Sequence, residues 1–152
     1  MQTKTDSYQE SNQERKENSR HFSLPGLLSV DYRLVLNIKT NTLSLLADGP
    51  LLVQQQQLSE VEKRALLPIL NAFPQACPYV VLLANISSAN APSTSIGYWQ
   101  QRLEEAQSRG TWQRELKPLR RALSSLRQKL RTFHLEISTV REMGYSLTMK
   151  LE

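Results

Sequence analysis

The sequence predicts an α+β protein in which a small antiparallel sheet comes first, helices follow and a β-hairpin ends the chain. The sheet is indicated by Tyr32 to Ile38, where apolar and polar residues alternate as in a half-buried strand. The helices are indicated most clearly by a stripe of four leucines, spaced four, three and four residues apart. They are Leu119, Leu123, Leu126 and Leu130. The hairpin is indicated by a second alternating stretch after Arg131.

Length and composition limit the classes of protein to which this chain can belong. A chain of 152 residues suits one domain with a single core. Its single cysteine, Cys77, excludes an internal disulfide and a cysteine-built metal site, and we expect it to be a small buried apolar residue. No apolar run has transmembrane length, and the first residues lack a hydrophobic signal core. We therefore expect a cytoplasmic protein with no membrane partner.

The net charge of +5 is concentrated near the end of the chain. Residues 1–30 carry four basic and four acidic groups, and residues 31–110 carry six of each. Residues 111–152 carry nine basic and four acidic groups, 9 − 4 = +5, which is the whole excess. A localised basic face is typical of a nucleic-acid-binding protein. The alternative interpretation is that the arginines only solubilise a surface helix.

The chain begins with a polar stretch. Residues 1–22 balance their charges and lack apolar periodicity, so we expect a disordered tail followed by one domain over residues 23–152. Pro25-Gly26 signals a turn. After the strand at Tyr32, two more strands are expected, with turns before each of them. The strands are Thr42–Leu46 and Leu51–Gln55, and the turns are Thr40-Asn41 and Asp48-Gly49.

The first helix has a clear start signal. Ser59 and Glu62 have the spacing of a capping box, in which each side chain bonds the backbone of the other residue. The helix should run to about Phe73, and Pro68 inside it should bend it. The expected inner stripe is Val61, Ala65, Leu66, Ile69 and Phe73.

The middle of the chain is less clear. Pro74 to Cys77 is expected to be a connector, and the apolar run Pro78 to Ile86 could be a strand or a buried helix, although its valines favour a strand. Ser87 to Ser95 is rich in small residues and is expected to be flexible. Gly97 to Gln107 has helical spacing, with Trp99, Leu103 and Ala106 on one side, and Gly110 should end this helix.

A basic helix and a hairpin follow. The helix is expected from about Leu116 to Arg131, with Pro118 in its first turn. Opposite its leucine stripe lie Lys117, Arg121, Ser124 and Gln128, and on the flank lie Arg120, Arg127 and Arg131. Alternation then resumes in Phe133, Leu135, Ile137 and Thr139 and, after a turn at Glu142-Met143-Gly144, in Tyr145, Leu147 and Met149.

Two short patterns in this segment resemble the end of an OmpR-type winged-helix domain, the DNA-binding part of many bacterial response regulators. Leu126, Arg127, Lys129 and Leu130 match the leucine-arginine-x-lysine-leucine end of the family's recognition helix. Thr139, Val140, Arg141, Gly144 and Tyr145 match its wing. Ser59 and Glu62 resemble the start of its first helix, whereas Glu142 stands where the family usually has glycine.

The resemblance implies a winged helix-turn-helix with three core helices, in which Pro78 to Ile86 is the second helix and has Leu82 and Leu83 inward. It further implies a sequence-specific transcription regulator, with the basic helix in the major groove and the hairpin wing on the adjacent minor groove or backbone. The residues then expected to contact duplex DNA are Lys117, Arg120, Arg121, Ser124, Arg127, Gln128, Lys129, Arg131, Arg141 and Tyr145. Family members often bind DNA as dimers, so a homodimer on DNA is one implied form.

The chain departs from the family between its second and third helices, where residues 87–115 form an insertion. The insertion holds both tryptophans. The tryptophans either pack the extra helix onto the domain or contact a partner. The second reading gives an alternative function, an adaptor that binds RNA polymerase, a sigma factor or another regulator. Its contact residues would be Tyr98, Trp99, Arg102 and Trp112.

Enzyme chemistry and bound cofactors are not expected. His21 and His134 are far apart and have no carboxylate or cysteine cluster at metal-ligand spacing. No glycine-rich phosphate loop is present, and Ser124-Ser125 lies on the basic helix, where contacts to phosphate or base edges suit it better than nucleophilic chemistry. A full response regulator also has a receiver domain ahead of its DNA-binding domain, and we expect no room for one in this chain. We therefore expect that abundance, a partner or an effector controls the activity of the protein.

Overall fold

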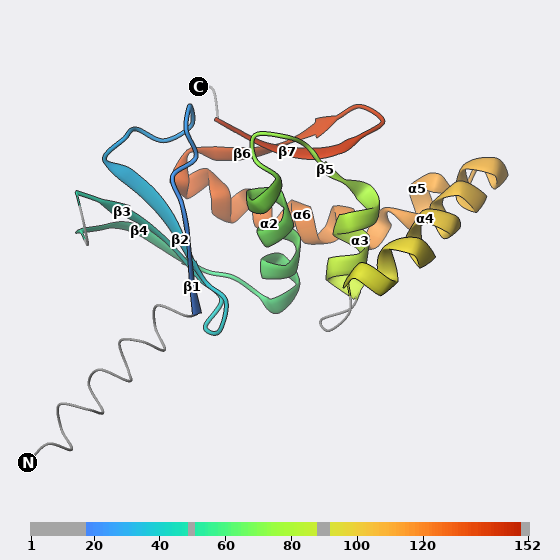
Figure 1. Ribbon diagram of the computed structural model, residues 1–152, viewed down its shortest axis with the longest axis horizontal. Coiled ribbons are helices and arrows are strands. Elements are labelled where there is room, and N and C mark those ends of the chain that lie inside the picture. The colour runs from blue at the N-terminus through green and yellow to red at the C-terminus, as the bar shows by residue number, and fades with distance from the viewer. Residues whose placement is uncertain (1–17, 49–50, 88–91, 150–152) are drawn as a thin grey trace, which may run out of the picture. The chain divides into compact units, whose positions relative to one another are not determined.

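The computed structural model describes residues 18–48, 51–87 and 92–149, and the chain divides into two compact units, residues 1–58 and 59–152 (Figure 1). The boundary falls inside the single domain expected over residues 23–152. Both units together make a mixed α+β protein, as the sequence predicted. Most of the predicted tail, the residues just after Asp48 and part of the small-residue stretch after Ser87 lie outside the described residues.

Unit 1 is a four-stranded antiparallel sheet with its strands in chain order. The strands are β1 (Ser19–Phe22), β2 (Tyr32–Asn37), β3 (Thr42–Ala47) and β4 (Leu51–Gln57). The three predicted strands are confirmed. Leu34 pairs with Leu45 and Leu36 pairs with Leu43, and all four side chains are buried, because alternate residues of each strand point to the same face.

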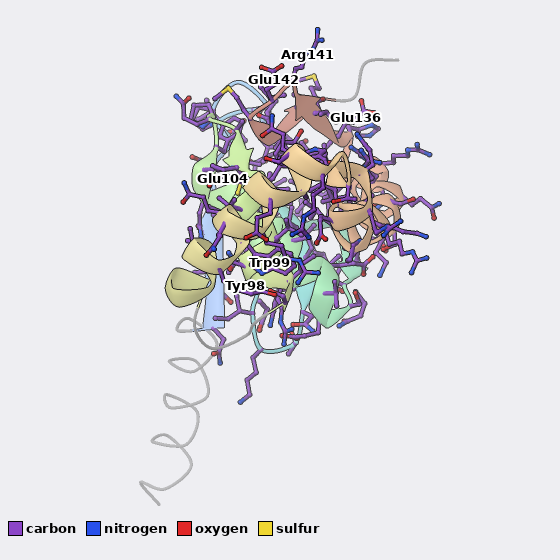
Figure 2. All side chains as sticks on the ribbon, turned by 90° about the vertical axis from the view of Figure 1, so that its right-hand side faces the viewer. Tyr98, Trp99, Glu104, Glu136, Arg141 and Glu142 are labelled. Carbon is purple, nitrogen blue, oxygen red and sulfur yellow. The ribbon has the colours of Figure 1, made fainter. Side chains whose placement is uncertain are left out.

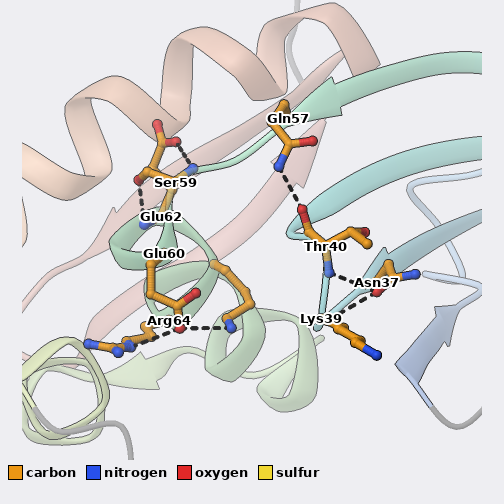
Figure 3. A network of polar contacts seen from close by, with 9 residues as sticks. Asn37, Lys39, Thr40, Gln57, Ser59, Glu60, Glu62 and Arg64 are labelled. Carbon is orange, nitrogen blue, oxygen red and sulfur yellow. Dashed lines mark hydrogen bonds and ion pairs between the residues drawn. The ribbon is translucent and has the colours of Figure 1, made fainter.

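The predicted turn between β2 and β3 is held by side chains. Asn41 has the left-handed φ of 60° that asparagine tolerates well. The Asn37 Oδ1 atom accepts hydrogen bonds from the backbone N–H groups of Lys39 and Thr40, both at 3.0 Å, and Gln57 Nε2 donates to the Thr40 carbonyl at 2.6 Å (Figure 3). The turn at Pro25-Gly26 is also confirmed, with Gly26 at φ 89°.

The prediction of a disordered tail over residues 1–22 is wrong for its last residues. Ser19 to Phe22 form β1, which pairs with β2 from Ser19 opposite Asn37 to Phe22 opposite Leu34. An edge strand is held by main-chain hydrogen bonds on one side, so it does not need the apolar alternation that identifies a half-buried strand. Only Phe22 supplies a large apolar side chain here, and it is half-buried.

Unit 2 contains the helices and a three-stranded sheet with the order β5-β7-β6. Its elements are α2 (Glu60–Ala72), β5 (Cys77–Pro78), α3 (Tyr79–Ser87), α4 (Pro92–Arg109), α5 (Trp112–Glu115), α6 (Lys117–Leu130), η1 (Arg131–Phe133), β6 (Leu135–Val140) and β7 (Gly144–Met149). In Figure 1, α6 (orange) lies beside α2 and α3, and the β6–β7 hairpin (red) runs alongside it.

Helix α2 starts at the predicted capping box. Ser59 Oγ accepts from the Glu62 N–H at 3.1 Å, and Glu62 Oε1 accepts from the Ser59 N–H at 2.7 Å (Figure 3). Pro68 does not end the helix, which continues to Ala72. Two predicted inward residues were wrong, because Val61 is 42% exposed and Phe73 is only half-buried. The inward position in the first turn belongs to Glu62, whose side chain the capping box draws inward.

Helix α3 is confirmed, and Leu82 and Leu83 are buried as predicted. The preceding connector was expected to have no regular structure, but Cys77 and Pro78 form β5 and pair with Tyr145 and Gly144 of β7. Two residues are too few for a periodicity to show. Cys77 is buried, and burial raises the pKa of its thiol to about 11, so the thiol is neutral at physiological pH.

The inserted helix α4 begins at Pro92, five residues before the predicted start at Gly97, so part of the stretch expected to be flexible is helical. Leu103 and Ala106, which the helical spacing placed on one side, are both buried. Gly110 follows the helix at φ 74° and ends it as expected.

Helix α6 confirms the leucine stripe, since Leu119, Leu123, Leu126 and Leu130 are all fully buried. The β6–β7 hairpin is confirmed as well. Phe133 was predicted to begin its first strand, but it lies in η1, and His134 at φ 60° turns the chain before β6 starts. Of the three alternating residues of β7, Tyr145 and Leu147 are buried, and Met149 is 46% exposed at the end of the strand.

Candidate nucleic-acid interface

The outward face of α6 is basic. The helix contains five Lys or Arg residues and no acidic residue between Lys117 and Leu130. Its exposed residues include Lys117, Arg120, Arg121, Ser124 and Gln128, and Arg131 follows at its end, also exposed. Because the leucine stripe fixes the opposite side in the interior, this face keeps its orientation as a rigid unit. We call these six residues the outward face.

Arg127 points toward the hairpin. Its Nε donates a hydrogen bond to the Ile137 carbonyl at 3.2 Å, and its guanidinium carbon lies 5.8 Å from the centre of the Tyr145 ring. The side chain is half-buried. Arg127 therefore ties α6 to both strands of the hairpin, through a hydrogen bond to β6 and a cation–π contact to β7.

Lys129 points toward α2. Its Nζ lies 2.7 Å from Glu62 Oε1, the oxygen that also closes the capping box. Burial alone would raise the pKa of the Glu62 carboxyl. Hydrogen bonds from Lys129, the Ser59 backbone and Ser125, with the charge of Lys129, outweigh burial and lower that pKa below its ordinary value. The sequence pattern assigned Lys129 to a DNA phosphate, whereas the structure engages its ammonium group inside unit 2.

The hairpin contributes one exposed arginine. Arg141 and the neighbouring Glu142 and Met143 are all exposed, and Figure 2 shows Arg141 and Glu142 together at the end of the hairpin. Glu142 adopts φ 65°, a left-handed conformation that glycine adopts without strain. Tyr145, another predicted DNA contact, is only 5% exposed and packs edge-on against Tyr79, with ring centres 5.5 Å apart.

A cleft of about 610 Å³ lies between the start of α3, α5, α6 and the hairpin. We call it the arginine cleft. Its lining includes three arginines and three aromatic residues: Arg120, Arg127, Arg141, Tyr79, Trp112 and Tyr145. Sequence reasoning had identified five of these six singly but had no signal that would join them. It missed Tyr79, which lies in the apolar run that became α3.

The four residues predicted to bind a partner do not form one cluster in the structure. Arg102 connects three of them: it donates to the Tyr98 hydroxyl at 2.7 Å, and its guanidinium carbon lies 5.4 Å from the centre of the Trp99 ring. Arg102 also forms a 2.7 Å ion pair with Glu115. Tyr98 is 57% exposed. Figure 2 shows Tyr98 and Trp99 side by side, well away from the end of the hairpin.

Both tryptophans also make contacts that attach the insertion to the rest of unit 2. Trp99 Nε1 donates to Ser87 Oγ of α3 at 2.9 Å. Trp112 is separate from the Tyr98 group and stands edge-on to Tyr79, with ring centres 5.6 Å apart. These contacts fit the packing interpretation of the tryptophans, and the exposed Tyr98 leaves a surface for the partner interpretation.

In residues 18–48, 51–87 and 92–149, no three His, Cys, Asp or Glu side chains are grouped as metal ligands. In the same ranges, no helix combines the length and the hydropathy that a membrane crossing requires.

Comparisons of the chain with protein-family models, with curated proteins and with solved structures found no match. The resemblance to the OmpR-type domain therefore rests on the residue patterns quoted above.

Proposed function

We propose that this protein binds duplex DNA sequence-specifically and regulates transcription, with α6 in the major groove and the β6–β7 hairpin on the adjacent minor groove or backbone. The observation that carries the proposal is the outward face of α6, an exposed and purely basic or neutral helix surface held by a fully buried leucine stripe. A major groove is wide enough to admit such a helix.

The arrangement of unit 2 supports this proposal. The resemblance implies three core helices followed by a hairpin. Here the helices α2, α3 and α6 and the hairpin strands β6 and β7 follow in that order, and β5 pairs with β7. Helices α4 and α5 are inserted between the second and third helices of this scheme.

The structure allows the proposed contacts to be divided by role. Arg121 lies nearly opposite the leucine stripe, so it is the proposed reader of base edges, where an arginine can bond guanine in a bidentate manner. Lys117, Arg120, Arg131 and Arg141 are exposed at the edges and are proposed to hold phosphates, which fixes position rather than sequence. We leave Lys129 and Tyr145 out of the contact set, because one is ion-paired and the other is buried.

A second function is favoured by one specific observation. Tyr98 is 57% exposed beside Trp99 and Arg102, on a helix that a winged helix-turn-helix does not need. An aromatic and arginine cluster of this kind is the composition of protein-interface hot spots. The alternative is therefore an adaptor in which α4 docks on RNA polymerase, a sigma factor or another regulator.

The test is a selection from random duplex DNA with the purified full chain. We expect enrichment of one motif. Arg121→Gln should lose the base preference at one position of that motif, while Tyr98→Ala should keep the whole motif. Arg109→Gln, an exposed arginine on the inserted helix, is the matched control and should also keep the motif. An unenriched pool with the unmodified protein would contradict sequence-specific binding and leave the adaptor as the better account.

A further inference from the structure

The arginine cleft has the size and chemistry of a small-molecule site. Its volume of about 610 Å³ lies within the range of roughly 300–1,000 Å³ that is usual for ligand pockets. It is formed by parts of the chain that are distant in sequence, with Tyr79 from α3, Trp112 from α5, Arg120 and Arg127 from α6 and Arg141 from the end of the hairpin.

The charge of the cleft favours an anion. Three guanidinium groups line it, and Glu142 is the only acidic residue among the described residues of the lining. Arg127 is held in place by its hydrogen bond to Ile137, so one of the three cations is preorganised. Arginine forms short, charge-assisted and often bidentate hydrogen bonds with phosphate oxygens.

The aromatic side of the cleft favours a planar group. Trp112 stands edge-on to Tyr79, which stands edge-on to Tyr145, so the three rings support one another. Trp112 and Tyr79 also line a second hollow of about 500 Å³ with Gln107 and Glu142. The indole is half-buried and borders both hollows, so it offers a fixed surface on which a planar ring can stack.

We propose that the arginine cleft binds a nucleoside phosphate, with the phosphates among Arg120, Arg127 and Arg141 and the base against Trp112 and Tyr79. In this arrangement Glu142, at the rim, accepts hydrogen bonds from the sugar hydroxyls or an exocyclic amino group. Binding of the nucleotide at this site does not depend on the proposed DNA-binding function. A regulatory consequence does rest on the proposed function: Arg120 and Arg141 are also proposed phosphate contacts for DNA, so the nucleotide and the duplex would compete.

The site is tested first without DNA, by calorimetric titration of the purified full chain at constant ionic strength. The probes are the triphosphates of adenosine, guanosine, cytidine and uridine, with pyrophosphate and the four nucleosides as part-ligands. We expect at least one triphosphate to bind about tenfold more tightly than pyrophosphate or its own nucleoside, because it uses both sides of the cleft. No binding by any triphosphate would overturn the proposal, and equal binding of pyrophosphate would reduce the cleft to an inorganic-anion site and overturn it as well.

Variants locate the binding in the cleft. Arg120→Gln and Arg141→Gln should each weaken triphosphate binding about tenfold or more, because each removes a charged hydrogen-bond donor. Arg121→Gln is the matched control, since Arg121 lies on the same helix but does not line the cleft, and it should bind as before. If Arg121→Gln weakens binding as much as Arg120→Gln, the attraction is general electrostatics and the site is refuted.

The contact between the nucleotide base and Trp112 is tested separately. Trp112→Leu should weaken the binding of the triphosphate and leave the binding of pyrophosphate unchanged. Trp112→Tyr keeps an aromatic ring, so the triphosphate should still bind more tightly than pyrophosphate by most of the original factor. Circular dichroism checks that both variants fold, and the tyrosine variant keeps the test usable if the leucine variant does not. If Trp112→Tyr weakens the binding of triphosphate and of pyrophosphate by the same factor, the stacking role of Trp112 is overturned.

Competition is then measured by fluorescence anisotropy with the selected duplex. A triphosphate that binds the cleft should release the DNA, and pyrophosphate at the same ionic strength should release much less. If the triphosphate binds in calorimetry but leaves the duplex bound, the regulatory consequence fails and the site stands. If the chain binds no duplex at all, the proposed function fails, and the calorimetric result still decides the site.

Discussion

Lys129 and Glu62 join the last turn of α6 to the first turn of α2, with Nζ and Oε1 2.7 Å apart. The two residues are 67 positions apart in the chain. The Glu62 side chain is only 4% exposed, whereas that of Lys129 is 32% exposed. Because the same carboxylate oxygen closes the capping box, one ion pair fixes both the start of α2 and the end of the basic helix.

The first prediction concerns this pair. Lys129→Met should lower the free energy of unfolding by about 1–3 kcal/mol, because it leaves a buried carboxylate without its charged partner. Denaturant unfolding at pH 7 measures the change. Lys117→Met is the matched control, since Lys117 is exposed on the same helix, and it should stay within about 0.5 kcal/mol of the unmodified protein. Equal effects of the two substitutions would show that the ion pair contributes nothing.

The second prediction follows from the lowered pKa of Glu62. Burial opposes ionisation there, but the hydrogen bonds from Lys129, Ser59 and Ser125 prevail, so the folded pKa lies below the unfolded value near 4.5. The stability that this carboxylate contributes is therefore fully present above pH 4.5 and is lost as the pH falls through the folded pKa. Unfolding measured at pH 7, 5, 4 and 3 should show a smaller acid loss for Glu62→Gln than for the unmodified protein. A Glu62→Gln protein with the same acid profile would mean that other carboxylates cause the loss.

The third prediction concerns the close approach of β5 and β7. A Cβ atom on Gly144 would lie 1.8 Å from the Cys77 carbonyl oxygen and 2.9 Å from the Pro78 Cα atom. Gly144→Ala must therefore push the two strands apart, which should cost about 1–3 kcal/mol or more in thermal unfolding. Glu142→Gly is the control in the same turn. It removes a left-handed non-glycine residue and should stay within about 1 kcal/mol. A tolerated alanine at Gly144 would contradict the pairing of Cys77 and Pro78 with β7.

The parts of the fold that the sequence could predict are those set by local pattern. The leucine stripe of α6 identified the buried side of a helix, and Ser59 with Glu62 identified the first turn of another, because both signals repeat at the spacing of one helical turn. The turn of the hairpin was also found, because a few consecutive residues are enough to indicate a turn.

The parts that could not be predicted depend on partners far away in the chain. Cys77 and Pro78 form a strand only because Gly144 allows β7 to approach. Lys129 looked like a DNA contact because it lies within a familiar short pattern, yet its partner is Glu62. The sequence could not predict the arginine cleft for a related reason, since Tyr79 and Arg141 come together only when β5 pairs with β7.

The fourth prediction uses the division between exposed and engaged cations. If Lys117, Arg120, Arg131 and Arg141 neutralise phosphates, the slope of log K against log salt for the selected duplex should be about −3.6. Arg131→Gln should reduce that slope by about 1, because it removes one phosphate contact. Lys129→Met should leave the slope unchanged, since its ammonium group is paired with Glu62. A slope change for Lys129→Met equal to that of Arg131→Gln would show that Lys129 leaves Glu62 to bind DNA.

The last prediction separates a base reader from a phosphate anchor. Arg121 lies nearly opposite the leucine stripe of α6, so its guanidinium should enter the major groove, whereas Arg141 is exposed at the end of the hairpin. Arg121→Ala should cost about 1–3 kcal/mol and relax the base preference at one position of the site. Arg141→Ala should weaken binding to all duplexes more evenly, or should reduce base preference only where the minor groove is narrow, because that groove carries little base information. The measurement is a pair of binding profiles over single-base variants of the selected site. If Arg121→Ala lowers every affinity by one factor and Arg141→Ala changes the preferred sequence, then the hairpin reads the bases and the proposed docking of α6 is wrong.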